Sequence, residues 1–280
     1  MVDKEIHYVT LPEEEFVKQS IDIVKRAQDE GIILRILGGL AVYIHTMDQP
    51  ETMSLYDRLR RFGEGKPQFT DLDLIGYSKQ MGKIEKFFER ELGFKPDFYV
   101  NRILGLKRLL FYHPENYYHV DIFFDKLEFS HDVEFGNKPG KGRLELDFPT
   151  IALCDIVLEK TQIHEINLKD VVDLIILFAG HDVAEDRGKD LIDGKYIAQV
   201  LCDDWGFWYD AMNNLKIVKE YTKNFFEEGK LKENEYNRIT GNIDKLIQII
   251  ESTPKTKKWR KRAEKGTSKK WWRDVEEVAR

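Results

Sequence analysis

Apolar residues recur with two different periods along the chain, and the period changes near Pro149. Before that residue, helical spacing over residues 13–30 and 79–92 alternates with short apolar runs that predict β-strands. These predicted strands cover residues 32–37, 69–77, 100–113 and 117–124, with a further β segment around 136–142 and its return strand at 143–147. After Pro149, helical periods cover residues 150–163, 168–179, 194–201, 205–226 and 233–251.

This change of period predicts an α/β (α+β) domain with a mixed sheet over residues 1–149, followed by an all-helical domain over 150–253. A basic, tryptophan-containing segment follows at 254–280. With 280 residues, of which 42% are hydrophobic and 34% charged, the chain is long and apolar enough for a packed core, which argues against disorder. Its apolar runs are far shorter than the ~18 residues of a membrane span, so no membrane partner is expected. Cys154 and Cys202 lie in apolar sequence and predict reduced core thiols in a cytoplasmic protein.

Charge is distributed unevenly along the chain. Residues 254–280 contain eleven Lys and Arg against four Asp and Glu, whereas the whole chain has a net charge of −6, so residues 1–253 are acidic, at −13. Within 255–273 the cations are interleaved with Trp259, Trp271 and Trp272. Two interpretations stay open: cations and indoles bind RNA, or the tryptophans dock the segment onto the acidic body.

Acidic residues interrupt two of the predicted strands. In Phe69–Ile75 the sequence FTDLDLI places Asp71 and Asp73 two residues apart, so both side chains point to one face of the strand. In YHVDIFF, Asp121 interrupts the strand at 117–124 in the same way. If the two strands are neighbours, the three carboxylates gather, and such a cluster needs a cation to offset its repulsion. This arrangement suits Mg²⁺ or Mn²⁺ and phosphoryl or nucleotidyl transfer.

Gly38 and Gly39 separate the first predicted strand from the helix at 40–46. Glycines let a backbone approach a ligand closely, and a helix N-terminus favours phosphate. Basic residues near these motifs are Arg58, Arg60 and Arg61, which are interpreted as a solvated helix face or as phosphate ligands, and Lys107 and Arg108, of which one faces each side of its strand.

Taken in order, the strand ending in Leu37-Gly38-Gly39, the Asp71-Leu72-Asp73 motif and the later Asp121 resemble the nucleotidyltransferase superfamily with the DNA polymerase beta-like fold. The stretch from Leu153 to Lys160, followed by KDVVDL at 169–174, is similar to the helical Lys…Asp-x-x-Asp-Leu motif of the AbiEii-type branch. That branch includes toxins of toxin–antitoxin systems. The chain departs from the family's pattern in the 32-residue interval from Gly39 to Asp71 and in having Gly-Gly rather than Gly-Ser.

The resemblance implies transfer of a nucleoside monophosphate from an NTP to a hydroxyl of RNA, protein or a small molecule, with release of pyrophosphate. Asp71 and Asp73 would hold Mg²⁺ (or Mn²⁺), and Asp121 would ligate the metal near the acceptor. The backbone of Gly38 and Gly39 would cradle the triphosphate, which Lys160 would neutralise, with Asp170 or Asp173 orienting it or bracing the site. The alternative is a non-catalytic nucleotide- or RNA-binding module or a toxin–antitoxin component with a cognate antitoxin.

Overall fold

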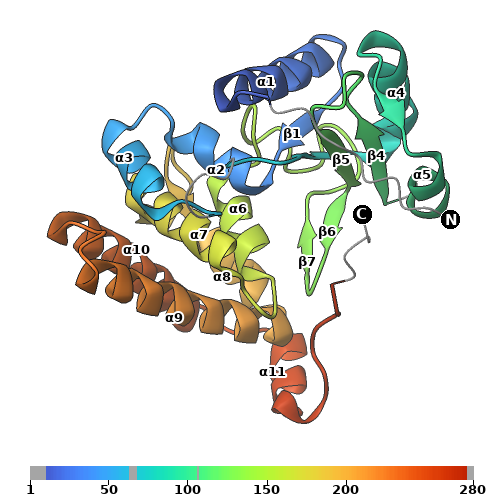
Figure 1. Ribbon diagram of the computed structural model, residues 1–280. Helices are drawn as coiled ribbons and strands as arrows, with labels where there is room; N and C mark the ends of the chain where they lie inside the picture. Colours follow the sequence, from blue (N-terminus) through green and yellow to red (C-terminus); the bar gives the residue numbers. More distant parts are fainter. Residues whose placement is uncertain (1–10, 63–67, 106, 276–280) are drawn as a thin grey trace, which may run out of the picture. The chain divides into compact units, whose positions relative to one another are not determined.

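The computed structural model of the chain describes residues 11–62, 68–105 and 107–275 (Figure 1). The chain divides into two compact units. The first comprises Met1–Ile44, Gly65–Leu127 and Glu134–Ala152, and the second comprises His45–Glu64, Glu128–Val133 and Leu153–Arg280. The first unit ends close to residue 149, where the period changes, but two short segments that precede this point belong to the second unit.

The first unit is built on a five-stranded mixed sheet. Its strands are β1 (Leu34–Ile36), β2 (Leu72–Gly76), β3 (Lys95–Pro96), β4 (Arg108–Tyr112) and β5 (His119–Phe124). They lie in the order β1-β2-β5-β4-β3, with β2 and β5 parallel and the other neighbours antiparallel. The helical segments that accompany them are α1 (Glu13–Asp29), α2 (Gly38–Thr46), η1 (Ser78–Gln80), α4 (Met81–Lys86), η2 (Phe87–Glu91) and α5 (Phe98–Leu104).

The two faces of this sheet differ in chemistry. Because paired residues project to the same side, the register gives one face that is entirely apolar apart from Gly76, with Leu34, Leu74, Ile122 and Phe111 among its buried members. On this face Phe88 of η2 stacks on Phe111 with ring centroids 5.0 Å apart. The opposite face carries the ionisable residues of the sheet, namely Arg35, Asp73, Asp121, His119, Arg108 and Lys95. The apolar face forms the core of the unit, so polar chemistry is confined to the other.

Two β predictions in this unit are wrong. Residues 100–113 were expected to form one strand, but the chain forms α5 before β4, because Asp97 caps the helix by accepting hydrogen bonds from the backbone N–H groups of Tyr99 (3.0 Å) and Val100 (2.9 Å). Residues 136–147, expected to form a β segment and its return strand, contain turns and bends instead. The extra strand pair is β6 (Lys126–Glu128) with β7 (Asp132–Glu134).

The second unit is predominantly helical. Its helices are α3 (Pro50–Leu59), α6 (Leu153–Thr161), α7 (Leu168–Gly180), α8 (Gly194–Leu201), α9 (Trp205–Glu227), α10 (Glu233–Ser252), α11 (Lys257–Ala263) and the short η3 (Gly266–Ser268). The small parallel pair β8 (Val183–Ala184) and β9 (Ile192–Asp193) departs from the all-helical expectation. α10 packs against α7, α8 and α9, and its buried Asn242 accepts a hydrogen bond from the Val183 N–H (3.0 Å) and donates one to the Phe178 carbonyl (2.9 Å).

Both cysteines are buried free thiols, as the sequence predicts. Within the described ranges, every helix is too short or too polar to cross a bilayer.

Candidate functional site

Gly38 and Asp73 meet where β1 passes into α2. The Leu37 N–H donates a hydrogen bond to the Asp73 carbonyl (3.1 Å), which fixes the end of β1 against β2. Gly38 has a φ of 73°, and a β-carbon at this position would lie only 3.2 Å from Asp73 Oδ2. The positive φ favours glycine here, and the absence of a β-carbon lets the backbone lie close to the Asp73 side chain. Gly39 follows in the first turn of α2, so the predicted glycines and the Asp-x-Asp motif come together.

The three predicted carboxylates also gather on one face of the sheet. Asp73 and Asp121 are paired in the register of β2 and β5, and Asp71 lies directly before β2. The buried His119 lies between Asp71 and Asp121, with its Nε2 atom 3.6 Å from Asp71 Oδ2 and 3.7 Å from Asp121 Oδ2. We call Asp71, Asp73 and Asp121 the carboxylate site.

Arg108 is a site residue whose role the sequence left undecided. Its Nε and Nη2 atoms each donate a 2.7 Å hydrogen bond to one oxygen of Asp121, and its guanidinium lies 5.2 Å from the centre of the Phe123 ring. The register explains the contact, since Arg108 pairs with Phe123 and therefore projects to the face of Asp121. Arg108 is thus the first residue of β4 and lies on the polar face, whereas Lys107 lies in the turn before the strand.

The carboxylate site fits a divalent cation through two of its members. As the described side chains stand, no three His, Cys, Asp or Glu residues among them form a metal-binding group, and both oxygens of Asp121 accept from Arg108. Asp71 and Asp73 nevertheless supply hard oxygen donors on one face. Mg²⁺ is commonly held by one or two carboxylates together with substrate phosphates, so this pair fits the ion.

Lys160, Asp170 and Asp173 form an ion-pair cluster within the second unit, and Arg61 joins it. Lys160 Nζ lies 2.9 Å from Asp170 Oδ1 and 3.0 Å from Asp173 Oδ2, and Arg61 Nη2 donates to Asp173 Oδ2 at 3.0 Å. We call these four residues the Lys160 cluster. Its centre is closed to solvent, because the Asp173 side chain is fully buried and that of Lys160 is 7% exposed.

The charges of this cluster stabilise one another. Burial by itself would lower the pKa of Lys160, but Asp170, Asp173 and Glu159 outweigh that effect and raise it. Burial would likewise raise the pKa of Asp173, yet Arg61 and Lys160 outweigh it and lower the pKa. Both groups are therefore charged at neutral pH. The described contacts of Lys160 are with acidic side chains of its own unit, and its role toward a triphosphate stays a prediction.

Of the three arginines in the long interval between Gly39 and Asp71, Arg60 is exposed, whereas Arg58 and Arg61 form ion pairs within the second unit. Arg58 pairs with Glu235 (2.6 Å) and Arg61 with Asp173, while Arg60 donates to the Asp57 carbonyl (3.2 Å). The Arg58 and Arg61 contacts connect α3 and the turn after it to α10 and α7. The spacing in the sequence contained no signal for these two ion pairs, because Glu235 and Asp173 lie more than one hundred residues away.

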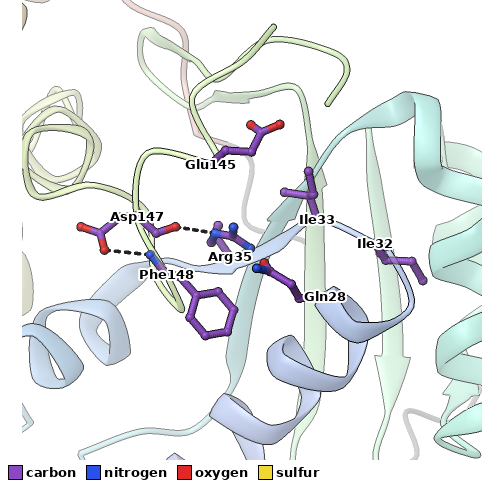
Figure 2. Close-up of a pocket in the computed structure, with 8 residues that line it drawn as sticks. Gln28, Ile32, Ile33, Arg35, Glu145, Asp147 and Phe148 are labelled. Carbon is purple, nitrogen blue, oxygen red and sulfur yellow. Dashed lines mark hydrogen bonds between the residues drawn. The ribbon is translucent and has the colours of Figure 1, made fainter. Parts of the chain in front are cut away.

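A second polar feature on the charged face of the sheet is a cavity of about 500 Å³ (Figure 2). Its lining consists of Gln28, Gly31, Ile32, Ile33, Arg35, Glu145, Asp147 and Phe148. Arg35 pairs with Ile75 in the β1–β2 register, so it projects to the same face as Asp73. Glu145 accepts hydrogen bonds from the Tyr77 hydroxyl and from the Gly140 N–H.

Arg35 is buried with backbone partners. Its Nε and Nη1 atoms donate to the carbonyls of Asp147 (2.6 Å) and Leu34 (2.7 Å), and the guanidinium lies 5.1 Å from the centre of the Phe148 ring. Burial lowers the pKa of this guanidinium, with Glu145, Tyr77 and Asp147 acting in the opposite direction. Sequence reasoning missed this cavity, because residues 143–147 were interpreted as a strand.

The C-terminal segment, residues 254–275, docks through its tryptophans onto the second unit. Trp271 packs against Trp205 and Tyr209, with ring centroids 5.7 Å and 5.0 Å away, and donates a 3.0 Å hydrogen bond from Nε1 to Asp210. Trp259 packs against Trp208 at 5.1 Å. Of the two interpretations of this segment, RNA binding or docking of its tryptophans, the contacts of Trp259 and Trp271 agree with docking.

Histidines and an arginine complete this docking. Asp210 also hydrogen bonds His131 Nε2 (2.7 Å) and His164 Nδ1 (3.0 Å), and Trp272 stacks on His164 with centroids 3.7 Å apart. Arg273 donates to the Phe129 carbonyl (2.9 Å) and pairs with Asp132. The cations of α11 remain on the surface: Lys257, Lys258, Arg260 and Lys261 are exposed. Residues 276–280 lie outside the described part of the chain.

Comparison with known proteins gave no match to a protein-family model, to a curated protein or to a solved structure.

Proposed function

We propose that this chain is a nucleotidyltransferase that moves a nucleoside monophosphate from an NTP to a hydroxyl acceptor. The observation that carries the proposal is the carboxylate site: Asp73 lies opposite Asp121 in a parallel strand pair, next to Asp71 and to the glycine that begins α2. Acidic residues at adjacent strand positions of a polar sheet face, beside a helix N-terminus, suit a metal-bound triphosphate. The nucleotidyltransferase fold itself is part of this proposal, as is the AbiEii-type likeness.

In the reaction the acceptor oxygen forms a bond to the α-phosphorus, and the bond from that phosphorus to the bridging oxygen breaks. Pyrophosphate leaves with the electron pair, and the acceptor loses its proton to a base. Asp71 and Asp73 would hold Mg²⁺ (or Mn²⁺), which supplies charge stabilisation to the phosphates when bound. The backbone N–H groups at Gly38 and Gly39 would face the triphosphate.

Asp121 and Lys160 have narrower proposed roles. Asp121 binds Arg108, so a role as ligand or proton acceptor near the acceptor hydroxyl requires this ion pair to open. While the pair is closed, Arg108 keeps a cation beside the carboxylate site. Lys160 braces α6 against α7 through Asp170 and Asp173, and its proposed contact with a triphosphate requires exchange of these partners.

Label transfer tests the proposal. The chain is incubated with each α-labelled NTP, Mg²⁺ or Mn²⁺, cellular RNA and a metabolite pool, beside Asp71→Asn. We expect transfer by the wild type and its loss in Asp71→Asn, because the substitution removes a charge with little change of shape. Asp22→Asn, an exposed charge removal on α1, is the matched control and retains activity. Full activity of Asp71→Asn contradicts the site, and absence of both transfer and NTP binding favours the non-catalytic alternative.

Metal and nucleotide binding give an independent measurement. Mg²⁺ with the correct NTP should raise the melting temperature of the wild type, since a ligand that binds only the folded state stabilises it. The rise should be much smaller in Asp71→Asn and unchanged in Asp22→Asn. An equal rise in all three proteins would place nucleotide binding away from Asp71.

The cavity lined by Arg35, Glu145 and Asp147 suits a small hydroxylated molecule, which is a second candidate acceptor. Arg35 would donate to it, and the carboxylates of Glu145 and Asp147 would accept from its hydroxyl or amino groups. In this case label appears in a metabolite, and Asp147→Asn raises the KM for that acceptor. Label in RNA that is unaffected by Asp147→Asn argues against this candidate.

A further inference from the structure

Helix α5 presents an unusually apolar surface to solvent. Phe98, Tyr99 and Ile103 are 82%, 76% and 61% exposed. With Arg102 they occupy adjacent positions of one helical face, because residues four apart align along a helix. We call these four residues the α5 face. Large exposed apolar groups that gather in this way mark interaction sites more often than bare surface.

The opposite side of α5 is fixed to the sheet at the residue that pairs with Asp121. The Asn101 side chain donates to the Leu110 carbonyl (3.1 Å) and accepts from the Leu110 N–H (2.7 Å). Leu110 is the register partner of Asp121, and Figure 1 shows α5 beside β4 at the edge of the sheet. The α5 face is therefore attached to β4, one strand away from the strand that carries Asp121.

Charge around α5 indicates what this face binds. Residues 95–108 contain four basic residues, Lys95, Arg102, Lys107 and Arg108, and one acidic residue, Asp97. Asp97 is committed to the helix cap and to the Tyr112 hydroxyl (2.9 Å). Lys95, Arg102 and Lys107 are exposed. In a chain of net charge −6, this stretch combines cations with open aromatic faces.

We infer that the α5 face binds single-stranded nucleic acid. Bases would stack on Phe98 and Tyr99, and the backbone phosphates would lie along Arg102, Lys95 and Lys107, as in other sequence-tolerant single-strand sites. An acidic protein would satisfy the cations, but two adjacent and widely exposed aromatic rings suit bases, each of which has a flat face. That the bound strand is also the acceptor rests on the proposed function.

Fluorescence anisotropy of the full chain tests the inference, with a labelled single-stranded RNA of about 12 nucleotides, the same DNA strand and a duplex. The test variant is Phe98→Ala with Tyr99→Ala. The matched control is Tyr221→Ala with Phe226→Ala, which removes two surface aromatics of α9 that are 38% and 36% exposed. We expect saturable binding of single strands by the wild type and the control, and at least tenfold weaker binding by the test variant. Relative affinity for the two strands tells RNA from DNA.

Two further measurements keep the outcomes distinct. Phe98→Trp with Tyr99→Trp retains stacking surfaces and should bind as the wild type does, which separates stacking from an effect on folding. Light scattering reports self-association. Unchanged strand binding by the alanine variant overturns the inference, and a dimer that this variant dissociates would identify the α5 face as a contact between copies. Equal binding by Asp71→Asn without any transfer by the wild type would leave this inference standing and contradict the proposed function.

Discussion

The C-terminal segment and helix α5 have the same ingredients, aromatic and basic side chains close together in the sequence, but they differ in where the aromatic rings lie. In the C-terminal segment, Trp271 and Trp259 pack onto α9, and most of the cations of α11 are exposed. In α5, Phe98 and Tyr99 face solvent, while the side chains of Asn101 and Asp97 fasten the helix to β4. An aromatic–basic composition therefore identifies a nucleic-acid site only when the rings remain accessible.

The strongest test of this comparison is the stability of Trp271→Ala against Tyr99→Ala. Trp271 contacts Trp205 and Tyr209 and donates to the buried Asp210. Its removal should lower the free energy of unfolding by about 2–4 kcal/mol, since a cavity results and Asp210 loses one of its three hydrogen-bond partners. Tyr99→Ala should change stability by less than about 0.5 kcal/mol. Denaturant unfolding measures both changes. Equal losses would contradict the distinction between packed rings in the C-terminal segment and exposed rings in α5.

Asp210→Asn should have the next largest effect. Its carboxylate forms hydrogen bonds with the side chains of His131, His164 and Trp271. In the asparagine variant, an NH₂ group replaces one of the two accepting oxygens. We expect a loss of about 1–3 kcal/mol in unfolding free energy, because buried donors lose their acceptor. Asp244→Asn is the matched control, because its partner Lys219 is exposed and exposed ion pairs contribute little. A neutral Asp210→Asn would mean that ring packing alone docks the segment.

Local patterns predicted the parts of the fold that local physics decides. The strand, Gly38-Gly39 and α2 follow one another as expected, and α8 begins at Gly194 and ends at Leu201 as predicted. α5 was missed because its apolar residues continue into those of β4. The signal that would have found it is Asp97, a good N-cap directly before the helix. The exposure of Phe98 and Tyr99 then depends on tertiary contacts, which the sequence pattern does not contain.

In the candidate site, too, some features follow from the local sequence pattern and others from tertiary contacts. Alternation along a strand places Asp71 and Asp73 on one face, and only the pairing of β2 with β5 adds Asp121. The partners of these groups are less accessible to prediction. Arg108 reaches Asp121 because of where β4 begins, and Arg61 reaches Asp173 across 112 residues of sequence. The sequence could not decide whether the C-terminal tryptophans dock or bind RNA for the same reason, because composition does not identify the residues that they contact.

Salt dependence sharpens the comparison through charge rather than stacking. For single strands the logarithm of affinity falls with the logarithm of salt concentration by about 0.7 per neutralised phosphate. Arg102→Gln should therefore reduce this slope by roughly that amount. Lys261→Gln, an exposed cation of α11, should leave it unchanged. The two slopes are measured by anisotropy at several salt concentrations, and a reduced slope in Lys261→Gln would return the C-terminal segment to the nucleic-acid interface.

Arg262→Met should have the smallest effect and tests whether charge contributes to docking at all. The Arg262 guanidinium lies 4.7 Å from the centre of the Trp205 ring and donates to the carbonyls of Gly266 (2.9 Å) and Lys269 (2.8 Å). Methionine keeps the apolar stem but removes the cation–π contact and both hydrogen bonds, so we expect a loss of about 1 kcal/mol in unfolding free energy. Arg260→Met, on the exposed side of the same helix, is the control. A loss as large as that of Trp271→Ala would mean that cations, rather than indoles, hold the segment, and the contrast with α5 would then rest on charge.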